Sequence, residues 1–314
     1  MSIDVHSLLF AAALALAGSP AHALEDASCK KVRFVDVGWS DIAATTGMAT
    51  VVLQALGYNP TVTIASIPIA FAGMKNKQID VFLGYWKPSM TPEIEPFIKD
   101  GHIQLLATPN LVGARYTLAV PSYLYDKGLR SFDDIAKFSK DLGGKIHGIE
   151  SGSDGNALIA GMIKGNRFGL KDFKLVEASE AAMLAEAQRA NRARKAIVFL
   201  GWEPHPMNVQ MKMHYLSGGD AVFGPEMGAA TVHTAVSAGF AAKCPNVAAF
   251  LNNLQFTADM QNKVMGPILG KVKPVTAARS FLKSNPGVVE PWLKGVTSLD
   301  GKDGLTAVTA ALSK

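Results

Sequence analysis

Three segments of this 314-residue chain place a tryptophan one or two residues after a glycine that is expected to close a short apolar strand. They end in Gly38-Trp39, Gly84-Tyr85-Trp86 and Gly201-Trp202. Because ligands of open α/β sheets lie beyond the carboxyl ends of the strands, we expect the three indole rings to meet at one binding site. The alternative is that each ring is a core anchor, since tryptophan is mostly buried in any protein.

A cluster of Trp and Tyr faces is suited to a quaternary ammonium ion. Such a cation has no N–H to donate, so cation–π attraction and apolar contact with its methyl groups must hold it. Tyr116, on the strand-like run Leu111–Val120, is the expected fourth wall of the box. Asp41, two residues after Trp39, is placed to offset the ammonium charge; alternatively it is an acid at a helix N-terminus, where it interacts with the helix dipole.

The segment from Glu150 to Asn156 joins a predicted strand to a predicted helix. Its backbone N–H groups would suit an anion, but Glu150 and Asp154 make an anion less favourable there. Asn156 is expected to bind a neutral hydroxyl group of the ligand, or alternatively to cap the helix.

Motifs of catalysis are missing from the chain. It contains no GxxxxGK[ST], GxGxxG, HExxH or GxSxG, and two cysteines are too few for a zinc ribbon. His205 lies between two prolines and is interpreted as a rigid loop residue. The Lys and Arg residues are dispersed without interleaved aromatic residues, so nucleic acid is not an expected partner. We therefore expect a protein that is not an enzyme and that has no cofactor and no metal.

The N-terminus has the pattern of a secretory signal. Leu8–Ala17 is an unbroken apolar run, and Ala21-His22-Ala23 provides a small-x-small cleavage site. We predict a signal peptide over residues 1–23, cleavage near Ala23 and a periplasmic product. Two cysteines in an oxidising compartment predict a Cys29–Cys244 disulfide, the alternative being two unrelated buried thiols.

Strand-like and helical patterns alternate along the chain, which predicts α/β layers around a mainly parallel sheet. With 48% hydrophobic and 18% charged residues, the chain is globular and long enough for about two domains. A return to the first unit after the Gly-rich stretch Ser217–Gly228 predicts that one lobe is inserted into the other. The expected boundaries are residues 24–112 and 213–314 for lobe I and residues 113–212 for lobe II.

At these residues the sequence resembles the periplasmic solute-binding proteins of ABC importers for choline and glycine betaine. The resemblance covers the whole mature chain and is carried by VGWSD (Val37–Asp41), DVFLGYWKPSM (Asp80–Met90), ARYTLAVP (Ala114–Pro121), SGSDGN (Ser151–Asn156) and GWEPHPMN (Gly201–Asn208). It implies the two-lobe type II periplasmic-binding fold, with a hinge that closes the lobes around one ligand.

The resemblance also implies roles for particular residues. The aromatic box of the family would fall on Trp39, Trp86, Tyr116 and Trp202, and the polar contacts would fall on Asp41 and Asn156. A Cys29–Cys244 disulfide fits the resemblance as well. The implied partner is the membrane permease of an ABC importer, and the chain is expected to be a monomer.

The implied ligand is choline. Betaine binders of the family hold a carboxylate through N–H groups and basic or polar donors, whereas this chain has acids near the expected position. Acetylcholine and betaine remain alternative ligands. An alternative function within the same family is that of a glycine betaine or carnitine binder. Two other classes are an exported enzyme acting on choline or its esters, which the missing motifs disfavour, and an extracytoplasmic sensor, which the lack of a later apolar span disfavours.

Overall fold

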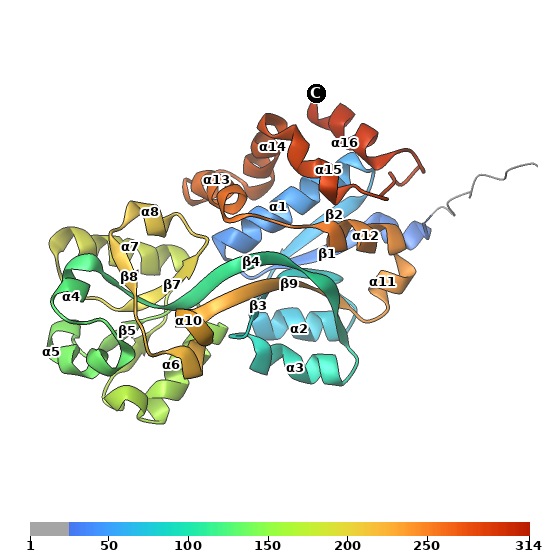
Figure 1. Ribbon diagram of the computed structural model, residues 1–314. Helices are drawn as coiled ribbons and strands as arrows, with labels where there is room; N and C mark the ends of the chain where they lie inside the picture. Colours follow the sequence, from blue (N-terminus) through green and yellow to red (C-terminus); the bar gives the residue numbers. More distant parts are fainter. Residues whose placement is uncertain (1–24) are drawn as a thin grey trace, which may run out of the picture.

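The computed structural model describes residues 25–314 and shows two α/β lobes joined by two long neighbouring strands (Figure 1). The predicted signal peptide, residues 1–23, lies outside the described residues. Nine strands form one continuous sheet in the order β2-β1-β3-β9-β4-β7-β5-β6, and β8 pairs with β4. The two-lobed α/β architecture expected for this chain is therefore confirmed.

The first lobe is built on parallel strands from the N-terminal part of the chain. Lys31–Asp36 forms β1, Asn59–Ile64 forms β2 and Val81–Lys87 forms β3. β1 pairs in parallel with β2 on one side and with β3 on the other. The β-branched and aromatic residues of β1 and β3 are buried, as expected for strands that are covered on both faces.

Two strands run between the lobes: β4 (Ile103–Pro121), in green in Figure 1, and β9 (Ala229–Ser237), in orange. They pair antiparallel with each other, β9 pairs antiparallel with β3, and β4 pairs antiparallel with β7. The prediction of a mainly parallel sheet is thus wrong, because the sheet is mixed. Each lobe keeps its parallel strands, and the antiparallel ladders arise where the chain crosses out of the first lobe and back.

The second lobe completes the sheet. β7 (Phe199–Glu203) lies beside β4, β5 (Lys145–His147) pairs in parallel with β7, and β6 (Lys174–Val176) pairs in parallel with β5. The short β8 (Met213–Tyr215) pairs antiparallel with the end of β4. The helices between these strands are α4 (Ser122–Asp126), α5 (Ser139–Leu142), α6 (Asp154–Lys164), α7 (Glu180–Ala193) and α8 (Met207–Gln210), and α9 (Asp220–Phe223) and α10 (Pro225–Gly228) lead into β9.

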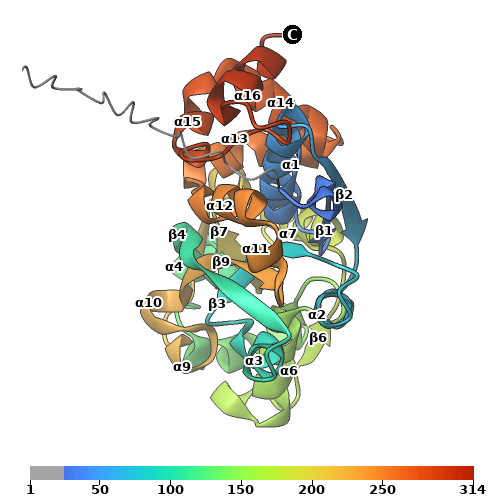
Figure 2. The ribbon, with the colours of Figure 1, turned by 90° about the vertical axis from the view of Figure 1, so that its right-hand side faces the viewer.

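Helices of the first lobe surround α1 (Ser40–Ala55), which is buried along nearly its whole length. Gly47 permits the close approach of α14, since a Cβ atom there would lie 2.9 Å from the Pro274 carbonyl oxygen. Figure 2 shows the C-terminal helices gathered near α1 at one end of the molecule. The other helices of this lobe are α2 (Ile67–Lys75), α3 (Thr91–Lys99), α11 (Phe240–Lys243), α12 (Pro245–Asn253), α13 (Ala258–Leu269), α14 (Pro274–Ser284), α15 (Val289–Trp292) and α16 (Gly304–Leu312).

Two clusters of buried apolar side chains stabilise the fold. One continues from the first lobe into the second, and the other lies among α1, the C-terminal helices and the start of β1. The second cluster contains Trp292 and a disulfide between Cys29 and Cys244. The disulfide prediction is confirmed. Among residues 25–314, no helix combines the length and the apolar character needed to cross a membrane.

Candidate functional site

The turn between β1 and α1 positions two of the predicted site residues. Gly38 has a φ of +90°, a conformation that favours glycine, and its N–H donates to Asp36 Oδ1 over 2.7 Å. α1 begins two residues later, with Trp39 as its N-cap residue and Asp41 in its first turn. Both side chains are thus presented at the carboxyl end of β1.

Trp86 and Trp202 lie within strands rather than beyond them. β3 continues through Gly84 to Lys87, and β7 continues through Gly201 to Glu203. The expectation that the glycines close these strands is wrong because both strands have antiparallel neighbours that extend the ladder: Trp86 pairs with Val232 and Trp202 with Tyr116.

The aromatic residues enclose one cavity between the lobes. It is lined by Trp39, Asp41, Trp86, Tyr116, Ile149 and Trp202. The ring centroid of Tyr116 lies 5.9 Å from that of Trp86 and 6.3 Å from that of Trp202. Each of the four aromatic residues is at most 5% exposed. The structure therefore brings together five of the six predicted ligand-binding residues.

Asn156 is the sixth, and it does not line the cavity. Its amide Nδ2 donates to the carbonyls of Ile149 and Glu150, and its Oδ1 accepts from the Ile149 N–H over 2.9 Å. Ser153 is the N-cap residue of α6. Asn156 thus orders the loop between β5 and α6.

Ile149 is a lining residue that the sequence reasoning did not name. It follows β5, a parallel strand whose carboxyl end points to the cleft. The rule that drew attention to the tryptophans, a position just beyond a strand, would have selected it too. Its aliphatic side chain carries no chemical signal that the sequence alone would reveal.

Burial controls the electrostatics of the cleft. Loss of solvent, reinforced by the neighbouring Glu180 carboxylate, raises the pKa of Asp41 to about 8. Burial also raises the pKa of Asp154 to about 7 and that of Asp36 to about 6. Asp41 Oδ2 accepts a 3.3 Å hydrogen bond from Trp86 Nε1, and its Oδ1 has no partner. The carboxyl of Asp41 is therefore available to a cation in the cavity.

The buried groups near the cavity are acidic. Across residues 25–314, the buried charged side chains include Asp36, Asp41, Asp154 and Glu180 but no Lys or Arg. Within the same residues, no three His, Cys, Asp or Glu side chains group as a metal site. A cavity of aromatic faces with carboxyls unmatched by a buried Lys or Arg in this part of the chain favours an organic cation, because ring quadrupoles and carboxylates both attract positive charge.

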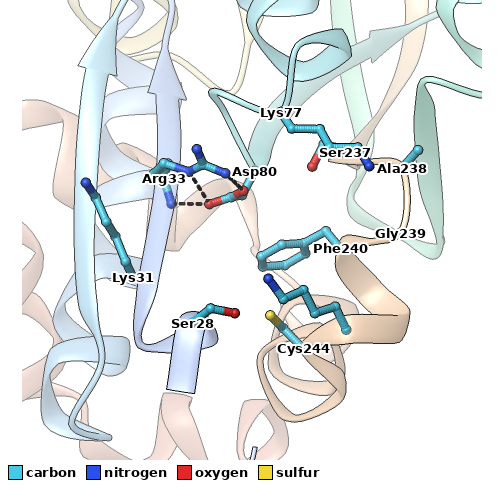
Figure 3. Close-up of a pocket in the computed structure, with 11 residues that line it drawn as sticks. Ser28, Lys31, Arg33, Lys77, Asp80, Ser237, Ala238, Gly239, Phe240 and Cys244 are labelled. Carbon is cyan, nitrogen blue, oxygen red and sulfur yellow. Dashed lines mark hydrogen bonds and ion pairs between the residues drawn. The ribbon is translucent and has the colours of Figure 1, made fainter. Parts of the chain in front are cut away.

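A larger hollow at the opposite end of the first lobe has the reverse character. Figure 3 shows it between the start of β1 and α11, with Lys31, Arg33 and Lys77 at its edge and Asp80 paired to Arg33. Lys243 also lines it, and its empty volume is about 910 Å³. Four cations and one carboxylate, itself paired, disfavour a cationic ligand there. The aromatic cavity is therefore the candidate site.

Two α/β lobes with an aromatic-lined cavity between them are the arrangement of a substrate-binding protein of the hinged two-lobe class. Residues 30–284 match the family model described as the substrate-binding domain of ABC-type glycine betaine transport systems. The match covers most of the chain, so the protein belongs to this family. Members of the family are transport proteins that act outside the cytoplasm.

Known structures and relatives agree with the family. An ABC-transporter choline-binding protein in complex with choline is 52% identical, with a TM-score of 0.89 over 92% of this chain and 100% of that chain. Lactococcal OpuAC in its closed form with glycine betaine is 27% identical, with a TM-score of 0.75 over 83% of this chain and 98% of that one. The glycine betaine/carnitine transport binding protein GbuC of Listeria monocytogenes is 31% identical over 52% of this chain and 55% of its own length.

Proposed function

We propose that this protein captures choline outside the cytoplasm and delivers it to the permease of an ABC importer. The observation that carries the proposal is the closed box of Trp39, Trp86, Tyr116 and Trp202 with the unpartnered Asp41 Oδ1 at its wall. The trimethylammonium group would lie among the rings, where cation–π attraction is strengthened because closure removes water. The choline complex of the 52% identical protein supports the same assignment.

The charge of the site favours choline over glycine betaine. Both molecules carry a trimethylammonium group, but glycine betaine adds a carboxylate that would enter a cleft already holding Asp41, Glu150 and Asp154. A bound trimethylammonium group favours the ionised form of these carboxyls, and like charges in a poorly solvated site then repel strongly. The hydroxyl group of choline brings no such charge. Asn156 would act on ligand selection indirectly, by fixing the loop that carries Ile149.

Glycine betaine or carnitine is the second candidate ligand. The specific observations in its favour are the glycine betaine held by OpuAC and the name of the Listeria relative. Acetylcholine carries the same trimethylammonium group and is a further candidate ligand of the same box.

The proposed product is a periplasmic monomer that is released by cleavage near Ala23 and is not an enzyme. The residues that line the aromatic box include no Ser, Cys, Lys or His to attack a bound ligand. Incubation with choline or acetylcholine followed by product analysis tests this part, and any turnover would contradict it.

The expected lobe boundaries, residues 24–112 with 213–314 and residues 113–212, are retained as a proposal with one refinement. β8 starts at Met213 but pairs with residues 119–121 of β4, on the side of the second lobe. The second boundary is therefore better placed after β8, where the chain leads through α9 and α10 into β9. Limited proteolysis of the ligand-free protein tests the two crossing points.

Isothermal titration of the mature chain with choline, with glycine betaine as competitor, tests the proposed function. Tight choline binding with weak betaine binding is expected. Preference for betaine would keep the aromatic box but contradict the role given to the carboxyls. If neither ligand binds, the proposal is overturned, and the four rings are then core residues without a ligand-binding role.

A further inference from the structure

Glu180 makes a buried contact across the cleft that the ligand cavity itself does not require. It is the first residue of α7 in the second lobe and is 4% exposed. Its carboxylate accepts from the Ser40 backbone N–H over 2.8 Å and from the Ser40 hydroxyl over 2.6 Å. Ser40 opens α1 in the first lobe, so the two hydrogen bonds join the lobes.

The position of Ser40 in the chain connects this contact to the ligand cavity. Ser40 lies between Trp39 and Asp41, two residues that line the cavity from the first lobe. A hydrogen bond to the backbone N–H of Ser40 fixes the peptide that links them. Glu180 therefore restrains the orientation of both neighbours when the lobes are together.

The same carboxylate is held from its own lobe by His205. The Nε2 atom of His205 lies 3.1 Å from Glu180 Oε1, and its Nδ1 accepts from the Met207 N–H over 3.0 Å. An accepting Nδ1 leaves the proton on Nε2, which donates to Glu180. The His205 ring also packs against Trp202 with centroids 4.9 Å apart. Glu180 is thus connected to the Trp202 wall as well as to the Trp39 wall.

We propose that Glu180 is a positioning residue that couples closure of the lobes to assembly of the box, by joining Ser40 on one side to His205 and Trp202 on the other. In the open form Ser40 would leave Glu180, and the Trp39 and Asp41 walls would lose this restraint. The carboxylate also acts on the ligand charge from behind the box, because it favours protonation of Asp41 when no cation is present. The inference rests on the proposed function for its ligand but on the hydrogen bonds alone for its geometry.

A double-mutant cycle on Glu180→Gln and Ser40→Ala tests the coupling. Each single variant is expected to weaken choline binding about tenfold, because a hydrogen bond to a charged group is lost from the closed form. The loss is expected in the dissociation rate, since the contact forms only on closure. The losses of the two single variants should not add in the double variant, because both changes weaken the same contact: Ser40→Ala removes the hydroxyl hydrogen bond, while the backbone N–H of residue 40 still reaches residue 180. Glu186→Gln, at a half-buried position of the same helix where the carboxylate pairs with Arg189 and not with the first lobe, is the matched control and should bind as wild type.

A structural role alone would give a different result. If Glu180 only stabilised the second lobe, Glu180→Gln would lower the melting temperature without changing the dissociation rate, or its effect would add to that of Ser40→Ala. Either result overturns the inference. Wild-type binding of choline is measured first, so a failure of the proposed function is seen separately. If the wild type binds no choline, X-ray scattering of the ligand-free variants tests the contact between the lobes instead. A larger radius of gyration for Glu180→Gln than for Glu186→Gln supports the contact, and equal radii contradict it.

Discussion

Tyr116 on β4 lies directly opposite Trp202 on β7 in an antiparallel pair, and their ring centroids are 6.3 Å apart. One ladder of the sheet thus fixes two walls of the cavity at once. Trp86 reaches Tyr116 from the first lobe, with centroids 5.9 Å apart. Because the third ring comes from the other lobe, the box is complete only when the lobes are closed.

Removal of one box ring should weaken choline binding strongly. A desolvated cation–π contact contributes about 2 kcal/mol or more, so Trp86→Ala is expected to raise the Kd for choline more than tenfold. Calorimetric titration measures the change. Trp292→Phe is the matched control, since Trp292 is buried in the other core cluster; it should lower the melting temperature and leave the Kd unchanged. An unaltered Kd for Trp86→Ala would remove Trp86 from the site.

Asp41→Asn should separate charge from shape. The asparagine keeps an oxygen that can accept from Trp86 Nε1 but removes the carboxylate next to the cation. At pH 8.5 we expect roughly a tenfold loss of choline affinity, as for a charge pair in a partly desolvated site. Glycine betaine should lose less, because its own carboxylate is no longer repelled. A parallel loss for both ligands would contradict the proposed basis of selectivity.

Choline binding should depend on pH. Burial raises the pKa of Asp41 to about 8 and that of Asp154 to about 7 in the ligand-free closed form. A bound cation favours the ionised carboxylates, so binding should release protons and affinity should fall as the pH decreases from 8.5 to 5.5. Titration in buffers of different ionisation enthalpy counts the protons. Proton uptake, or a flat profile, would contradict the assignment.

The stability of the ligand-free protein should show the opposite trend. The ordinary pKa of these carboxyls is 3.8, well below their values in the folded chain. Between pH 4 and pH 8 the folded state holds protons that the unfolded chain has released, so this contribution to stability is lost as the pH rises. Thermal melts of wild type and Asp41→Asn isolate the effect, because the variant should lose part of the slope. Equal slopes would show that Asp41 is already hydrated.

Loss of the disulfide should affect stability without affecting the site. The Cys29–Cys244 bond closes a loop with a sequence separation of 215 residues, which corresponds to about 5 kcal/mol at most in the chain-entropy model. The Cys29→Ser, Cys244→Ser double variant should therefore unfold at much lower denaturant concentration. Its Kd for choline should stay within about twofold, as the bond lies away from the cavity in the other core cluster. A large loss of choline affinity in the folded variant would contradict this prediction, because it would show that the disulfide and the cavity are coupled through the first lobe.

A pair of alanine substitutions in α6 tests the packing behind Tyr116. A Cβ atom on Gly155 would lie 2.0 Å from Tyr116 Oη, whereas one on Gly161 would meet nothing within 4 Å. Gly155→Ala should displace the ring and raise the Kd for choline. Gly161→Ala should stabilise the protein by about 1 kcal/mol through helix propensity and leave the Kd unchanged. Tight binding by Gly155→Ala would mean that the ring position does not matter.

The sequence alone located most of the box because the signal is local. An apolar run followed by Gly and Trp occurs three times, and it indicated the binding edge of the sheet although Trp86 and Trp202 lie inside their strands. The acidic character of Asp41 follows from its residue type, and the disulfide was predicted because the chain has only two cysteines. The structure brings Trp39, Trp86 and Trp202 to one cavity, as that pattern predicted.

Tertiary structure alone decided the remaining features, because they depend on register between distant segments. The antiparallel course of β4 and β9 follows from pairing between residues more than 100 positions apart, and local periodicity does not encode strand direction. The Asn156 side chain forms hydrogen bonds with the backbone of its own loop and does not line the cavity. Glu180 and Ser40 are 140 residues apart, and neither shows any pattern of its own. Residue type determined which chemistry this protein carries, and long-range packing determined which side chains reach the cavity.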